Sequence, residues 1–226
     1  MGKAKLTEAQ AAAIEAVVRE AEGKTSAEIA GAMIKESSDY ARHELLGAII
    51  VGLFFFTGVT VFTPSLESWI QTLTWSYSSL LLVGAAGFST FLVIGITYFL
   101  ANLAPIDRWI VPRRVMNEKV RRRAIRHFLE SGVHRTRERN GLLIFVSLLE
   151  RRIEIVADIG ITDKVPPETW EAVVAGMRES LRSGNTAEAL ARAVSQCGDI
   201  LAGLFPPRTD DINELSNKVQ ILRDDS

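Results

Sequence analysis

Three acidic residues on or beside predicted β-strands have the side chains best suited to chemistry. Glu28 opens one predicted strand, and Glu154 and Asp158 lie in a second stretch with alternating side chains. On an extended strand Glu154 and Asp158 share a face. If Glu28 lies on a neighbouring strand, the three carboxylates gather at one end of a sheet, and hard cations such as Ca²⁺ or Mg²⁺ need such oxygen ligands. The alternative is that these acids face solvent or cap turns, paired with nearby arginines.

Other residues with chemical potential give weaker signals. His134 lies beside Arg135 and Arg137, where it could bind a phosphate, although a histidine in such a position more often caps a turn. Cys197 is the only cysteine, so a disulfide framework is excluded, and we expect it in an apolar core. The sequence has no Cys-x-x-Cys or His-x-x-His pair for zinc, no glycine-rich phosphate loop and no nucleophile elbow. The sequence therefore does not decide whether the protein is an enzyme.

Three predicted strands carry or flank these acids. Residues 28–34 are predicted as one strand. Residues 142–149 form a near-continuous apolar run, typical of a strand covered on both faces, and residues 153–158 pair with it as a hairpin. Amphipathic helices are expected at both ends of the chain, the first with a capping box formed by Thr7 and Gln10. These elements predict an α/β (α+β) domain, an αβα sandwich with a small mixed sheet.

A charge-poor block interrupts this domain. Residues 45–106 contain a single charged residue, Glu67, although the 226-residue chain has 26 basic and 27 acidic residues. Two uncharged stretches, about 45–62 and 79–103, are long enough to cross a ~30 Å hydrocarbon core as helices. Pro64 between them favours a turn or a helix start, and Gly84 and Gly87 favour close helix packing. The block predicts a transmembrane hairpin that interrupts the sandwich and has the lipid bilayer as its partner.

Basic residues predict how the hairpin is oriented. Eight Lys and Arg residues lie between 107 and 126, and the connector 63–78 has none. The positive-inside rule then places the connector outside and both termini in the cytoplasm, as in a two-span, multi-pass protein of an inner membrane. The basic run could instead bind nucleic acid, but the net charge of −1 gives no general reason for that, and a juxtamembrane cluster facing anionic lipid explains it. Two spans without an internal ionisable residue argue against transport.

The flanks of the hairpin are expected to fold together. One strand precedes the block and two follow it, and neither a lone strand nor an isolated hairpin is stable. We therefore predict one split cytoplasmic domain from residues 1–40 and 113–205, with the hairpin at 41–112. The polar tail, 206–226, is predicted to be solvated and partly disordered. The alternative is an N-terminal segment with no fold of its own.

The non-membrane chain resembles the TPM domain family, in the subgroup with an inserted transmembrane hairpin. The matching pieces follow the family's order along the chain: 25–29, 38–40, Phe128, 132–136, 139–148, 154–161, Lys164-Val165, Trp170, Phe205-Pro206 and the tail 211–217. The resemblance implies an α/β/α arrangement. It also implies, from particular members, an acid phosphatase activity or calcium binding.

The resemblance leaves two functions in view. The first is a membrane-anchored binding or regulatory module with a protein partner or a second copy of itself. The second is a divalent-metal-dependent acid phosphatase that uses Glu28, Glu154 and Asp158 with Ca²⁺ or Mg²⁺. The family supplies no catalytic motif that can be carried onto this chain.

Overall fold

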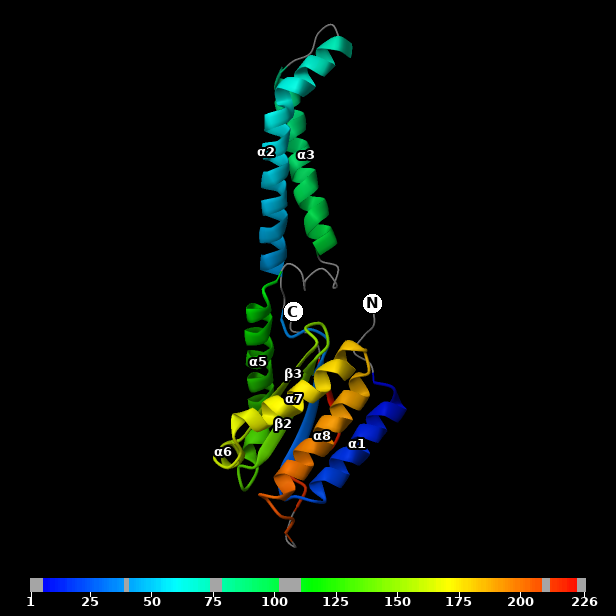
Figure 1. The fold of residues 1–226 in the computed structure, drawn as a ribbon, viewed down its shortest axis with the longest axis vertical. Coiled ribbons are helices and arrows are strands. Elements are labelled where there is room, and N and C mark those ends of the chain that lie inside the picture. The colour runs from blue at the N-terminus through cyan, green and yellow to red at the C-terminus, as the bar shows by residue number, and fades with distance from the viewer. Residues whose placement is uncertain (1–5, 39–40, 74–78, 102–110, 209–211, 223–226) are drawn as a thin grey trace. The chain divides into compact units, whose positions relative to one another are not determined.

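The structure is a computed structural model that describes residues 6–38, 41–73, 79–101, 111–208 and 212–222. The chain divides into two compact units (Figure 1). One, here called the folded unit, consists of residues 1–39 and 114–226, and the other, the hairpin unit, consists of residues 40–113.

The hairpin unit contains two long apolar helices. These are α2, Ala41–Leu73, and α3, Ser79–Ala101. Both are long and apolar enough to cross a membrane by length and composition. Helix α2 continues through Pro64, so the predicted turn or helix start at that proline is wrong. The predicted second stretch runs to residue 103, and its last two residues lie outside the part that the structure describes.

The two apolar helices approach each other at a glycine that the sequence analysis did not single out. A Cβ added to Gly52 of α2 would lie 2.3 Å from Cγ1 of Ile94 on α3. Gly84 and Gly87, which we expected at the contact, have no atom within 4 Å of the corresponding position. These two glycines therefore do not form the contact between α2 and α3 within the chain, and packing between copies of the chain through them stays a prediction.

The described residues of the folded unit form four strands and several helices. Helix α1 and strand β1 precede the hairpin unit in the chain, and the other elements follow it. Its elements are α1 Glu8–Glu22, β1 Glu28–Ile34, α5 Arg113–Glu130, the 3₁₀ helix η1 Val133–Arg135, β2 Gly141–Ser147, β3 Arg152–Ala157, α6 Ile159–Thr162, α7 Pro167–Arg182, α8 Thr186–Ala202 and β4 Gln220–Leu222. The first residue of α5 is assigned to the hairpin unit.

The four strands form one mixed sheet in the order β3-β2-β1-β4. Strand β1 pairs in parallel with β2, from Glu28 opposite Gly141 to Ile34 opposite Ser147. Strands β2 and β3 form the expected antiparallel hairpin. The short strand β4 adds to the other side of β1, also in parallel. Strand β1, which precedes the hairpin unit, is therefore an inner strand of a sheet whose other strands all follow it.

Helices cover both faces of the sheet, which confirms the predicted α/β/α arrangement (Figure 1). Helix α5 packs on one face, where Val120, Ala124 and Phe128 contact alternate residues of β1 and β2. Helices α1, α7 and α8 pack on the other face. Burial of both faces explains why residues 142–146 read as a continuous apolar run.

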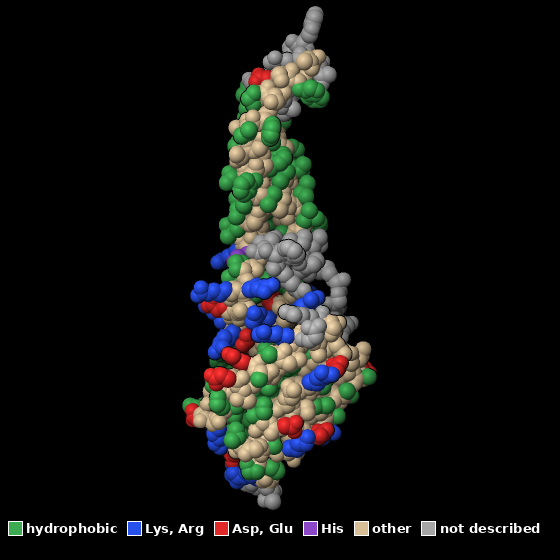
Figure 2. Space-filling view, in the orientation of Figure 1, with side chains coloured by type: hydrophobic (Ala, Val, Ile, Leu, Met, Phe, Trp, Pro, Cys, Tyr) green, Lys and Arg blue, Asp and Glu red, His purple; other side chains and the backbone are tan. Residues whose placement is uncertain are grey.

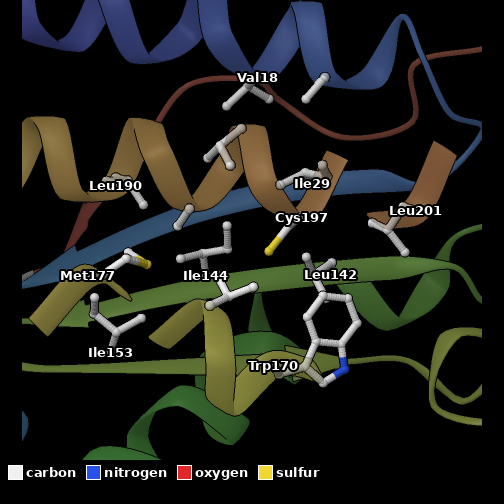
Figure 3. Close-up of a cluster of buried hydrophobic side chains, with 14 of the residues drawn as sticks. Val18, Ile29, Leu142, Ile144, Ile153, Trp170, Met177, Leu190, Cys197 and Leu201 are labelled. Carbon is white, nitrogen blue, oxygen red and sulfur yellow. The ribbon is translucent and has the colours of Figure 1, made fainter. Parts of the chain in front are cut away.

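The larger core lies between the sheet and α1, α7 and α8 (Figure 3). Ile144 and Leu142 of β2 face Leu190 and Cys197 of α8, with Trp170 of α7 at one end. Cys197 is fully buried, as predicted, and burial raises the pKa of its thiol to about 12. The thiol is thus a core side chain and not a reactive one.

Candidate functional site

A network of buried polar groups lies where β1 and β2 begin and β3 ends. Asn140 is buried just before β2, and its side-chain amide donates to the carbonyl of Ser26 at 2.5 Å. The backbone N–H of Asn140 donates to Oγ1 of Thr136 at 3.0 Å. Thr25 completes the network because its hydroxyl donates to the carbonyl of Phe205 at 2.7 Å. These bonds tie together the segment before β1, the loop before β2 and the segment after α8.

Glu28 lies at this end of the sheet, but its carboxylate already has partners. Its side chain is 5% exposed. Oε1 accepts the backbone N–H of Glu214 at 3.0 Å, and Oε2 accepts that of Leu215 at 3.2 Å. A buried carboxylate that accepts two N–H groups is well compensated for lost hydration. Glu28 therefore binds the C-terminal tail.

Asp158 lies at the same end, two strands away. It is the N-cap residue of α6, with Oδ1 accepting the backbone N–H of Ile159 at 2.8 Å. Its Oδ2 lies 3.3 Å from Nε of Arg139 in an ion pair. Arg139 has a positive φ of 55°, an unusual conformation for a non-glycine residue. Asp158 follows β3 and is not part of the strand, in contrast to the sequence prediction.

Gly141 explains why Glu28 and Asp158 do not meet. Glu28 is paired with Gly141 on one side, and the backbone N–H of Asp158 donates to the carbonyl of Gly141 on the other. The two acids are thus about 9–10 Å apart across two strand spacings. A Cβ on Gly141 would lie 2.1 Å from the carbonyl oxygen of Val133. The backbone of η1 therefore occupies the space over Gly141.

Glu154 lies further along β3, opposite Phe145. It is half-buried, and burial raises the pKa of its carboxyl above the usual value, while the charges of Arg121 and Arg152 act in the opposite direction. Asp158 lies four positions further along the chain, which corresponds to about 13 Å of extended backbone. The structure therefore brings Glu28 and Asp158 to one end of the sheet and leaves Glu154 with the arginines of α5 and β3.

The predicted metal site has no preformed arrangement in this part of the molecule. Within the described residues, no three His, Cys, Asp or Glu side chains form a group that could hold a metal ion. Both oxygens of Glu28 and Oδ1 of Asp158 accept hydrogen bonds, whereas Oδ2 of Asp158 is buried and has, among the described residues, only the ion pair with Arg139. The binding of Ca²⁺ or Mg²⁺ by Glu28, Glu154 and Asp158 stays a prediction.

A cavity of about 240 Å³ opens beside the buried network. Its lining includes Ser26 and Asn140, the arginines Arg137 and Arg208, and Glu214 of the tail. The carboxylate of Glu214 accepts the backbone N–H of Arg137 at 3.0 and 3.2 Å. The cavity is therefore lined by donors and acceptors from three segments that are far apart in the sequence.

Sequence reasoning found only part of this site. The role of Asn140 in joining distant segments has no local signal in the sequence. The sequence also did not indicate that residues 212–222 contact β1 and contain the strand β4. Most of residues 212–222 are exposed, as expected of a solvated tail, but they are ordered by contacts with Glu28 and Glu22 far upstream, which the sequence did not indicate.

His134 and His127 both contact neighbouring groups of the folded unit. Nδ1 of His134 lies 3.4 Å from the carbonyl of Phe128, and its ring packs on the Phe128 ring. His127 is buried on α5 beside Phe145, and burial, followed by the charge of Arg123, lowers the pKa of its imidazole. Neither histidine lines the cavity beside Asn140.

Comparison with known proteins identifies a domain type and a fold. Residues 108–200, about two fifths of the chain, match the family model of the TPM domain. Among curated proteins, none matches this chain.

A solved structure resembles almost the entire chain. It is the NMR structure of the BA42 protein from the psychrophilic bacterium Bizionia argentinensis, with a TM-score of 0.57 and 20% sequence identity. The alignment covers 98% of this chain and 100% of BA42. At this identity the likeness shows a shared fold and no more.

Proposed function

We propose that the protein is a membrane-anchored binding or regulatory module in which α2 and α3 cross the bilayer and the folded unit lies in the cytoplasm. The surface of the two apolar helices carries this proposal. Hydrophobic side chains cover the hairpin unit (Figure 2), and Leu80, Phe91 and Phe54 are 80%, 77% and 76% exposed. Burying one such side chain contributes about 1.5–3 kcal/mol, so water is an unfavourable environment for this surface and hydrocarbon a favourable one.

Charge supports the orientation. The connector between the helices has no basic residue, whereas α5 contains Arg113, Arg114, Lys119, Arg121, Arg122, Arg123 and Arg126. Basic residues close to a membrane span are retained on the cytoplasmic side. A two-span protein with both termini in the cytoplasm satisfies this rule.

Membrane extraction tests the anchor. The full chain should stay in the membrane pellet after alkaline carbonate treatment. Arginine at the centre of a span costs about 2.5–3.5 kcal/mol, so the double variant Phe54→Arg/Phe91→Arg should be released in part. The control is Ile159→Arg, at a side chain that is 57% exposed on the folded unit. Release of the wild-type chain by carbonate would contradict the proposal.

Protease accessibility tests the orientation. In intact cells with a permeabilised outer envelope, external protease should leave a fragment containing Trp170 of α7 undigested. After the membrane is opened with detergent, the same protease should digest it. Digestion of this region before detergent would place the folded unit outside.

A second candidate is a divalent-metal-dependent acid phosphatase. It is supported by Glu28 and Asp158 at one end of the sheet, next to a cavity lined by arginines. Purified full chain should then hydrolyse a generic phosphomonoester when Ca²⁺ or Mg²⁺ is added, and Asp158→Asn should abolish turnover. Unchanged turnover in Asp158→Asn, with Glu171→Asn on the exposed side of α7 as the control, would remove the proposed site.

A further inference from the structure

We infer that the outer edge of β1 is a binding site for an extended peptide, and that residues 212–222, here called the strap, are its built-in occupant. A partner segment with the same side-chain pattern would bind by displacing the strap. The inference rests on the proposed function as a binding module, and it names the ligand class of that module.

The strap is held at its beginning by buried polar groups. The Glu28 carboxylate accepts two successive backbone N–H groups of the strap, from Glu214 and Leu215, at 3.0 and 3.2 Å. Glu214 in turn places its own carboxylate on the backbone N–H of Arg137. A buried acid that receives backbone N–H groups recognises a peptide main chain, whatever its side chains.

A second acid links the strap to the edge of the sheet. One oxygen of Glu22 accepts the backbone N–H of Ile29 in β1 at 3.1 Å, and the other accepts the side-chain amide of Asn217. Glu22 therefore satisfies a donor of β1 and contacts the strap with the same carboxylate.

Apolar side chains of the strap dock on both sides of the sheet edge. Leu215 and Leu222 pack against the core under α5, and Val219 packs against the core on the opposite face. Val219 lies over Gly31 of β1, where a Cβ at Gly31 would be in ordinary contact with Cγ2 of Val219 at 3.4 Å. The bound segment thus needs glutamate followed by leucine, an apolar residue five positions after the glutamate and another eight positions after it.

The strap is attached weakly enough to be exchanged. Its strand β4 has three residues, and Ile221 is 49% exposed. Pairing with β1 is limited to Ala32–Ile34, whereas β1 and β2 pair over seven residues. Strand addition to a sheet edge is a common mode of peptide recognition, and the backbone of β1 offers this edge once the strap leaves.

A competition experiment tests the inference on the full chain in lipid nanodiscs. The probe is a fluorescent peptide with the sequence of residues 212–222. The receptor is a strap-weakened chain, Glu214→Ala/Leu215→Ala/Leu222→Ala, which leaves β1 and Glu28 intact. We expect this chain to bind the peptide at least tenfold more tightly than the wild-type chain, whose own strap competes at high effective concentration.

The groove is tested by adding Glu28→Gln to the strap-weakened chain. Glutamine keeps the shape but replaces an acceptor oxygen by an amide, and loss of a charged hydrogen bond should weaken peptide binding about tenfold or more. Glu171→Gln, at an exposed site on α7, should leave binding unchanged. Equal binding to wild-type and strap-weakened chains, or binding unaffected by Glu28→Gln, would overturn the inference.

Hydrogen exchange keeps the test decisive if the strap-weakened chain loses its fold. In the wild-type chain, the amides of 214–215 should exchange faster than those of β2, and Glu28→Gln should accelerate them at least tenfold without changing β2. A strap that exchanges as slowly as β2 in both chains would sink the inference. Carbonate extraction tests the membrane anchor separately from peptide binding. If the chain stays in the membrane but the peptide does not bind, this inference is contradicted and the proposed anchor is not.

Discussion

Substitution of Gly198 by alanine tests whether the segments before and after the hairpin unit form one core. Gly198 of α8 faces Ala21 of α1, and a Cβ at residue 198 would lie 2.6 Å from the Cβ and 3.2 Å from the Cα of Ala21. Carbon atoms prefer a separation of about 3.5–4.0 Å. The two helices would therefore have to separate by about 1 Å.

Two opposing effects set the size of the change. Alanine in place of glycine inside a helix stabilises by about 1 kcal/mol. Overpacking a tight contact costs about 1–3 kcal/mol, and loosened packing between α1 and α8 adds to that cost. We expect Gly198→Ala to lower the free energy of unfolding by about 0.5–2 kcal/mol. The matched control is Gly176→Ala, at an exposed position of α7 with no atom within 4 Å, which should stabilise by about 1 kcal/mol.

A double-mutant cycle isolates the contact. Ala21→Gly removes the methyl group that the new Cβ would meet, so Ala21→Gly/Gly198→Ala should recover at least 1 kcal/mol relative to the sum of the single variants. The assay is chemical unfolding of the detergent-solubilised chain, followed by hydrogen exchange of α1. If Gly198→Ala stabilises as Gly176→Ala does, and no coupling to Ala21 appears, α1 does not pack on α8 and the reasoning fails.

Four further outcomes are expected. Asn140→Ala should destabilise the folded unit by about 1–3 kcal/mol in chemical unfolding, because it removes the buried amide that donates to the carbonyl of Ser26. Cys197 should resist iodoacetamide at pH 8 until the chain is unfolded, since burial raises its pKa to about 12. Burial and the charge of Arg123 lower the pKa of His127, so the unfolded state takes up the proton first. The stability linked to His127 is therefore present above its unfolded pKa of about 6.5 and is lost as the pH falls through the lower folded pKa. His127→Gln should make the free energy of unfolding depend less on pH between pH 7 and pH 5. Replacing residues 41–112 with a ten-residue Gly/Ser linker should leave a chain that remains in solution without detergent and keeps the exchange protection of β2.

Local pattern predicted the elements and the hairpin of β2 and β3, but not the parallel pairing of β1. Strand β1 was predicted with the bounds that the structure has, and β2 and β3 within two residues at each end. The Thr7–Gln10 capping box is also present. These features depend on neighbours in sequence, such as side-chain alternation and cap spacing. The parallel pairing of β1 with β2 depends on contacts more than one hundred residues apart, and no local pattern predicts it.

The candidate site shows the same limit. Alternation predicted Glu154 and Asp158 on one face of a strand, but β3 ends at Ala157 and Asp158 caps α6, which the local pattern did not indicate. The tail has a polar composition typical of a solvated segment. Its order comes from Glu28 and Glu22, which lie almost two hundred residues upstream. The composition of a segment indicates how much apolar surface it can bury by itself. It does not indicate which contacts distant residues of the chain make with it.

The position of the insertion explains how one chain accommodates both units. Parallel neighbours such as β1 and β2 require a crossover connection, and α5 is the crossover helix that covers one face of the sheet. The hairpin unit enters this connection between β1 and α5, so it interrupts a loop and no element of the core. Lys119 of α5 donates to Oγ of Ser38 at 2.7 Å, which ties the end of β1 to the helix that resumes the fold. The entropy cost of closing a loop rises only slowly as the loop lengthens. The sheet can therefore form with a long insertion in this connection, provided that the two ends of the insertion meet at this contact.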